Sequence, residues 1–199
     1  MYVIIEGIDG SGKDTQGDRL AARLAKMTSE VVRVNEPDNS LPTGQLLRQM
    51  LKDGTYVEAH AAMFLADRMA MLATKVKPVL ARGGSVVSVR SWMSTLVYQQ
   101  ENWPLEWLKD IHKQLPCKAD YVILLDIDPE MALQRATRRP GHMEFYEKVD
   151  IQKRNRQRYL DLVYESAPFL APFGQVKVVD ASAPPDEVEQ AVAEAIGYP

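Results

Sequence analysis

The sequence predicts an α/β fold in which a parallel sheet is flanked by helices. Five short runs of apolar, largely β-branched residues alternate with longer segments of helical periodicity, which is the order that βαβ units produce. Nearly every position in each run is apolar, as expected for strands that are buried on both faces. A glycine-rich segment follows the first run directly. Because ligands of such sheets bind at the carboxyl ends of the strands, we expect the functional site at that edge.

The periodicity gives bounds for each element. Asp128-Pro129 indicates an N-cap followed by proline at the first helical position. The expected strands span residues 2–6, 31–34, 85–89, 121–125 and 176–179. The expected helices span residues 13–27, 44–52, 58–81, 93–100, 129–138, 149–164 and 185–196.

Length and composition limit the class of protein. The chain has 199 residues, of which 46% are hydrophobic and 26% are charged, as is usual for a globular protein. No repeat or long linker divides it, so we expect one domain over residues 1–199. Lysine and arginine total 24 against 27 aspartates and glutamates, a net charge of −3. Since neither sign forms a long block, we expect no nucleic acid polymer as a partner.

Cysteine content and hydropathy bear on the compartment. Cys117 is the only cysteine, which excludes an intrachain disulfide and a cysteine-based zinc site. The first apolar run is too short for a signal peptide, and no stretch approaches the 18 apolar residues of a membrane span. We therefore expect a cytoplasmic protein that makes no use of a membrane.

The segment after the first strand predicts a phosphate-binding loop. A helix begins at its lysine, and this strand-to-helix context is what the motif requires. Its glycines let successive N–H groups point into a concavity, and the helix N-terminus adds about half a positive charge. A turn that only connects strand and helix would not need a lysine at this offset. We expect the phosphates of a nucleoside triphosphate at Gly7, Asp9, Gly10, Ser11, Gly12, Lys13, Asp14 and Thr15.

Asp14 departs from the usual loop, in which a serine or threonine after the lysine ligates Mg²⁺. A carboxylate near phosphates must be offset by a metal or an arginine. Two interpretations stay open. Either Asp14 helps to hold the metal, or this position is permissive.

Five further segments of the chain, taken together with the loop, match the pattern of one protein family. They are Phe64-Leu65-Ala66-Asp67-Arg68; Arg90 with Ser94, Tyr98 and Gln99; Ala119 to Arg135; Tyr146-Glu147 with Gln152 and Tyr159; and Val179-Asp180-Ala181-Ser182. In this order they resemble segments of the thymidylate kinases, which phosphorylate dTMP. The resemblance covers most of the chain. It implies a P-loop NTPase fold with a five-stranded parallel sheet and a short lid that contains arginines, and it implies ATP, Mg²⁺ and a homodimer.

The resemblance also implies how the acceptor binds. Arg90 would hold the phosphate of dTMP, while Phe64 stacks on the pyrimidine and Arg68 hydrogen-bonds its edge. Asp9 would contact the sugar 3′-hydroxyl, and Tyr98 would crowd the place of a ribose 2′-hydroxyl. Packing in the core is the alternative for Phe64, and a surface contact with Asp67 is the alternative for Arg68. The other expected substrate contacts are Ser94, Thr95 and Glu147.

The expected lid spans residues 135–147 and has three arginines just before Pro140-Gly141. Such an arm can fold onto ATP and bring a guanidinium to the transferring phosphoryl group. Gly10-Ser11 has no basic residue, which resembles the family members with a catalytic arginine in the lid. A solvated basic helix end is the alternative for each arginine. The expected catalytic residues are Lys13, Arg90, Arg138 and Arg139, and the expected ATP contacts outside the loop are Arg135, Asp180 and Ala181.

Two more positions depart from the family pattern. Val89 replaces the aspartate expected before Arg90, so Asp14 could supply the carboxylate toward Mg²⁺ that residue 89 lacks. Asn39 stands where eukaryotic-like members have a phosphate-binding arginine, and Arg48 is the one visible compensation. The expected reaction is ATP-dependent phosphorylation of dTMP to dTDP. Two alternatives stay open, namely a kinase for another or modified deoxynucleoside monophosphate (dUMP-like) and a nucleotide-binding homologue that has lost turnover.

Overall fold

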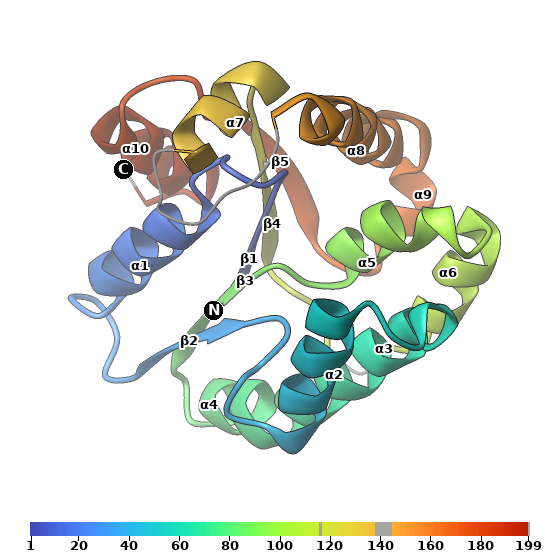
Figure 1. Cartoon of the computed structure of the whole chain (residues 1–199). Coiled ribbons are helices and arrows are strands. Elements are labelled where there is room, and N and C mark those ends of the chain that lie inside the picture. Colours follow the sequence, from blue (N-terminus) through green and yellow to red (C-terminus); the bar gives the residue numbers. More distant parts are fainter. Residues whose placement is uncertain (116, 138–144, 199) are drawn as a thin grey trace.

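A five-stranded parallel sheet forms the centre of the molecule (Figure 1). The computed structural model describes residues 1–115, 117–137 and 145–198. All the strand pairings are parallel, in the order β2-β3-β1-β4-β5. The expected sheet is therefore confirmed, with strand bounds within about one residue of those expected. The strands are β1 (Tyr2–Glu6), β2 (Val31–Asn35), β3 (Ser85–Val89), β4 (Tyr121–Asp126) and β5 (Gln175–Asp180).

The register of the central strands places three chain segments at one edge. Ile5 of β1 lies opposite Val89 of β3, and Val89 lies opposite Asn35 of β2. The glycine loop after β1 and the residues that follow β2 and β3 therefore meet at the carboxyl edge of the sheet. All residues of β1 and β3 are buried, in agreement with their mainly apolar sequences. Ser85 and Ser88 are the buried polar residues of β3.

Helices cover both faces of the sheet. In Figure 1, α1 (Lys13–Leu24) and α10 (Pro185–Ala195) lie on one side, and α5 (Trp92–Tyr98) and α8 (Phe145–Glu165) lie on the other. Buried side chains from both layers, such as Leu20 and Tyr159, complete the core. The remaining α-helices are α2 (Pro42–Asp53), α3 (His60–Met71), α4 (Lys77–Ala81), α6 (Leu105–His112), α7 (Pro129–Thr137) and α9 (Ala167–Leu170).

Two helical predictions were incomplete. The expected continuous helix over 58–81 is divided into α3, a π-helical turn at Leu72–Val76 and α4. Pro78 explains the interruption, because proline has no backbone N–H to donate to the preceding turn. Two further helices, α6 and α9, were not expected from the sequence, because they are short and flanked or interrupted by proline.

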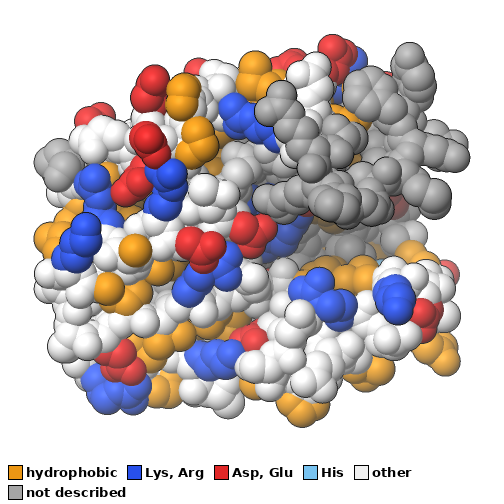
Figure 2. All heavy atoms as spheres, turned by 60° about the vertical axis from the view of Figure 1, so that its left-hand side comes forward, with side chains coloured by type: hydrophobic (Ala, Val, Ile, Leu, Met, Phe, Trp, Pro, Cys, Tyr) orange, Lys and Arg blue, Asp and Glu red, His pale blue; other side chains and the backbone are white. Residues whose placement is uncertain are grey.

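The surface agrees with the mixed charge of the sequence. Figure 2 shows lysine and arginine side chains interspersed with aspartate and glutamate over the visible face. Within the described part of the chain, no helix combines the length and apolar character needed to cross a membrane.

Candidate functional site

A cavity of about 830 Å³ opens at the carboxyl ends of β1, β2 and β3. One end is lined by Leu51 and Phe64 of the α2–α3 region. The other end is lined by Arg135 and by residues near Ala181, and the glycine loop lies between them. This is the edge at which ligands of open α/β sheets bind, and its two ends can accept two ligands in one cavity.

The glycine loop has the conformation that its sequence predicts. Gly10 and Gly12 have φ values of +84° and +91°, a region that residues with a Cβ rarely adopt. A Cβ at Gly10 would lie 2.0 Å from the carbonyl oxygen of Ala132, and one at Gly7 would lie 2.7 Å from that of Leu125. The loop therefore needs glycine for close backbone packing as well as for its turns.

Lys13 lies at the start of α1, beneath the loop. Its Nζ donates a hydrogen bond to the carbonyl oxygen of Ile8 at 2.7 Å and lies 3.8 Å from the Asp9 carboxylate. Burial, with the charge of Arg90 added, lowers the pKa of Lys13 to about 7. A polyphosphate in the cavity would oppose both effects, so the site is built to receive negative charge.

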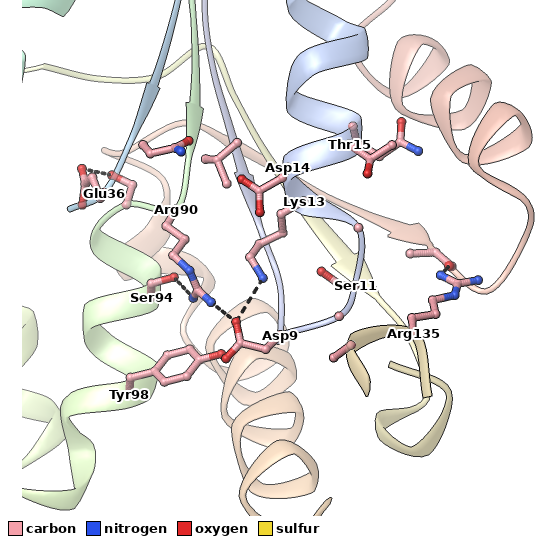
Figure 3. A pocket seen from close by; sticks show the side chains of 18 of the residues that line it. Asp9, Ser11, Lys13, Asp14, Thr15, Glu36, Arg90, Ser94, Tyr98 and Arg135 are labelled. Carbon is pink, nitrogen blue, oxygen red and sulfur yellow. Dashed lines mark hydrogen bonds and ion pairs between the residues drawn. The ribbon is translucent and has the colours of Figure 1, made fainter. Parts of the chain in front are cut away.

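Arg90 follows β3 and points toward the loop (Figure 3). Its guanidinium forms an ion pair with Asp9, donates to Ser94 Oγ at 3.1 Å and lies 5.1 Å from the centre of the Tyr98 ring. Its φ is +67°, which costs conformational energy in a residue other than glycine. Lys13, Asp9 and Arg90 are thus held together between the two ends of the cavity.

Glu6, the last residue of β1, positions the start of α5. Its buried carboxylate accepts hydrogen bonds from the backbone N–H groups of Ser91 and Ser94, at 2.7 and 3.1 Å. The hydroxyls of Ser94 and Tyr159 donate to its other oxygen, at 2.6 and 3.0 Å. Burial raises the pKa of Glu6. The sequence analysis assigned Glu6 no role, although a carboxylate ending an apolar strand was the available signal.

Of the residues expected at the acceptor, Phe64, Ser94 and Tyr98 line the cavity together with Asp9 and Arg90. Phe64 is partly exposed to the cavity.

Arg68 and Thr95 lie behind the cavity wall. The Arg68 side chain is 1% exposed and donates from Nε to Glu36 at 3.0 Å and from Nη2 to Thr95 Oγ1 at 3.0 Å. Nη1 lies 2.8 Å from His112 Nε2. Arg68 is therefore a buried residue that hydrogen-bonds to Glu36 and Thr95, and the alternative expectation of a surface contact with Asp67 is wrong. Glu36, which lines the cavity, connects Arg68 to it.

His112 accepts rather than donates toward Arg68. Its Nδ1 lies 2.7 Å from the carbonyl oxygen of Leu108, a contact that requires a proton on Nδ1 and leaves Nε2 as the acceptor. Burial, with the charge of Arg68 added, lowers the pKa of His112 to about 3. Burial also raises the pKa of Glu36 to about 7, although Arg68 opposes this shift.

Of the three residues outside the loop that were expected to contact ATP, Arg135 and Ala181 lie at the end of the cavity near α7. Arg135 lies on the far side of the loop from Arg90 (Figure 3) and donates to the carbonyl oxygens of Ala181 and Ser182, at 2.6 and 2.7 Å. Arg135 and Ala181 line the cavity. Asp180 instead accepts the N–H of Ser182 at 2.8 Å, which lowers its pKa and shapes the segment after β5.

Asp14 and Val89 both line the cavity, as does Thr15. Asp14 Oδ1 lies 3.0 Å from Arg33 Nη2, so an arginine offsets this carboxylate. Among the described residues, no group of three or more histidine, cysteine, aspartate or glutamate side chains could hold a metal ion.

Arg48, expected to compensate for the missing arginine at position 39, lines the cavity and donates from Nε to Asn39 Oδ1 at 2.5 Å. Several other lining residues were assigned no role from the sequence, because their place at the cavity depends on which strands are neighbours. Among them are Gln16, Asn35, Glu36, Ser91, Gln99, Pro185 and Val188.

Three of the site residues expected in the lid have no described side chain. Arg138 and Arg139 lie outside the described residues, and so does the side chain of Glu147. Their roles stay predictions.

Comparison with known proteins agrees with this geometry. Residues 5–192 match the family model described as thymidylate kinase. The chain is 33% identical over 200 residues to a probable thymidylate kinase of Methanosarcina acetivorans, covering 98% of this chain and 94% of the relative. It is 34% identical over 192 residues to a probable thymidylate kinase of Thermococcus gammatolerans, covering 91% and 88% respectively. The chain therefore belongs to the thymidylate kinase family, a family of nucleoside monophosphate kinases.

Proposed function

We propose that the protein transfers the γ-phosphoryl group of ATP to dTMP, giving ADP and dTDP. One observation supports this more than any other, namely the placement of Lys13, Asp9 and Arg90 at the middle of a two-ended cavity. A cation for the donor phosphates and a cation for the acceptor phosphate lie next to each other there. Such an arrangement favours direct transfer between two bound nucleotides.

The donor would lie along the loop and toward Arg135. The loop N–H groups and the N-terminus of α1 attract its phosphates, and Lys13 balances charge at the transferred group. Arg135 and Ala181 line this end of the cavity, and Asp180 supports the segment behind them through its hydrogen bond with Ser182. One of the lid arginines, Arg138 or Arg139, would stabilise the transition state.

The acceptor would lie between Phe64 and Arg90. Phe64 offers a ring for the pyrimidine, and Arg90 with Arg48 offers charge for the phosphate. Asp9 would accept a hydrogen bond from the 3′-hydroxyl of the sugar, and the Tyr98 ring would limit the space beside the sugar. Because the phosphate of a monoester is largely ionised at neutral pH, the reaction needs no general base to create its nucleophile.

Mg²⁺ prefers oxygen ligands, and one or two carboxylates with phosphates and water suffice. Asp14 and Thr15 offer such oxygens at the start of α1, and the Asp14 side chain is 54% exposed. These residues therefore fit the ion in donor type, with most ligands coming from phosphate and water. When bound, Mg²⁺ would neutralise charge on the ATP phosphates.

We further propose a homodimer, consistent with the family resemblance. α2 and α3 pack against each other and leave Leu46 and Met69 55% and 50% exposed. A second copy would cover these apolar side chains. Light scattering of the purified chain would test this, with Leu46→Glu expected to shift the mass toward the monomer. A cytoplasmic setting stays a prediction from the sequence.

The experiment for the reaction is a coupled ADP-release assay with dTMP, dUMP, dCMP, dGMP and dAMP as acceptors. We expect kcat/KM to be highest for dTMP, because the family model that the chain matches and its similar relatives are described as thymidylate kinases. Lys13→Ala, with its fold checked by circular dichroism, is the control for contaminating kinases. A chain that binds ATP but releases no ADP with dTMP contradicts the proposal.

A further inference from the structure

Arg33 of β2 lies between two carboxylates of α1. Its Nη2 is 3.0 Å from Asp14 Oδ1, and its Nε is 2.6 Å from Asp18 Oδ1. Nη1 donates to Asn35 Oδ1 at 2.7 Å. Nη1 and Nη2 each donate a hydrogen bond, to Asn35 and Asp14, whereas Nε lies near Asp18 without a hydrogen bond of its own. The two hydrogen bonds fix the side of the guanidinium that faces Asp14.

The residues packed around Arg33 leave space for the guanidinium in this orientation. A Cβ at Gly17 would lie 2.6 Å from Val89 Cγ2 and 3.5 Å from Arg33 Nε. Glycine at this position of α1 therefore leaves room for the valine and the guanidinium. Three residues therefore pack together near Asp14, namely Gly17 of α1, Val89 at the end of β3 and Arg33 of β2.

Stability of the fold does not account for this arrangement. Asp14 and Asp18 are 54% and 67% exposed, and ion pairs with exposed partners contribute little to the stability of a fold. The two carboxylates differ in another respect. Asp14 lines the cavity beside the glycine loop, whereas Asp18 is not among the lining residues.

An aspartate directly after the loop lysine brings negative charge toward the place proposed for the ATP phosphates. Lys13 is already engaged with Ile8 and lies near Asp9. Without a nearby cation, the field of Asp14 would oppose the binding of a polyanion. Arg33 is the cation paired with Asp14 among the described residues.

We propose that Arg33 is a positioning residue for nucleotide binding, which neutralises Asp14 and holds its carboxylate toward β2. The inference rests on the proposed function in one respect, because it takes the loop as the ATP phosphate site. It explains how the chain tolerates aspartate at position 14. Arg33 itself need not touch the nucleotide.

The test is ATP binding to the full chain by calorimetry in EDTA, so that metal ligation does not enter. Arg33→Met should weaken ATP binding about tenfold, because Asp14 loses its counter-charge. Adding Asp14→Ser should return the affinity to within about threefold of the Asp14→Ser single variant. The loss in Arg33→Met should also shrink as salt is raised, since salt screens exposed charges.

Asp18→Ser is the matched control, because Asp18 pairs with the same guanidinium outside the cavity. The Arg33→Met/Asp18→Ser variant removes the other carboxylate that pairs with Arg33, and its ATP affinity should stay about tenfold weaker than that of the wild type. Equal rescue by both serine variants would assign Arg33 a purely structural role and overturn the inference. Arg33→Met with wild-type affinity would also overturn it.

The proposed function is tested separately in the same preparation. Wild-type chain that binds ATP but does not phosphorylate dTMP contradicts the function and leaves the role of Arg33 intact. Wild-type turnover of dTMP combined with unchanged ATP affinity in Arg33→Met contradicts only the role of Arg33.

Discussion

The Arg90 guanidinium forms an ion pair with the Asp9 carboxylate across the carboxyl edge of the sheet, although the two residues are 81 positions apart. Arg90 thereby joins the loop proposed for ATP to the α5 region proposed for dTMP. Its contact with Ser94 extends this connection to Glu6, which anchors the start of α5. Any change in one nucleotide site can therefore alter the geometry of the other.

Lys13→Ala should lower phosphoryl transfer by at least about a hundredfold. Lys13 is the one basic residue of the glycine loop, and its removal leaves the donor phosphates without a cation at that point. The fold should persist, because burying this ammonium is itself unfavourable, as its lowered pKa of about 7 indicates. Near-normal turnover with an unchanged circular dichroism spectrum would falsify this prediction.

Tyr98→Ala should raise activity on a ribonucleoside monophosphate relative to its deoxy partner. The Tyr98 ring lines the cavity next to Arg90, and its removal opens space where a 2′-hydroxyl would lie. We expect the ribo/deoxy ratio of kcat/KM to rise at least about tenfold. Tyr98→Phe keeps the ring and is the control, with a ratio close to that of the wild type. An unchanged ratio in Tyr98→Ala would show that the ring does not select the sugar.

One arginine of the pair Arg138 and Arg139 should act in the transition state. Replacing that residue by alanine should lower kcat by at least about a hundredfold with little change in KM for dTMP, because transition-state contacts appear in kcat. Steady-state kinetics of the two single variants would identify it. If both variants keep kcat within a few-fold of wild type, Arg135 becomes the next candidate.

His112 should make the fold sensitive to acid. Its pKa is about 3 in the folded chain and about 6.5 when unfolded. Between these values the unfolded chain binds one more proton at this residue. The free energy of unfolding should therefore fall as pH is lowered from 6.5, by up to about 1.4 kcal/mol per pH unit from His112.

Urea unfolding of wild type and His112→Gln between pH 4.5 and 7 would measure this contribution. Glutamine can still accept a hydrogen bond from Arg68 but does not titrate. We expect a shallower dependence on pH in the variant. Parallel pH profiles of the two proteins would exclude His112 as the cause.

The sequence by itself determined the strands, the glycine loop and the part of the cavity lining that this loop supplies. Buried parallel strands must be apolar along their length, and the loop needs its glycines and lysine at set offsets, so both leave local signals. Phe64, Arg90, Ser94 and Tyr98 were expected from the resemblance of short segments to the thymidylate kinases, and all four line the cavity.

The tertiary structure alone decided which distant side chains meet. Arg68 is 32 residues from Glu36 and 44 from His112, and His112 lies on a helix that periodicity did not reveal. Arg33 is 19 residues from Asp14, and their pairing depends on β2 lying next to β3 under α1. Such contacts follow from strand order and helix packing, which place residues in space without leaving any fixed spacing in the chain.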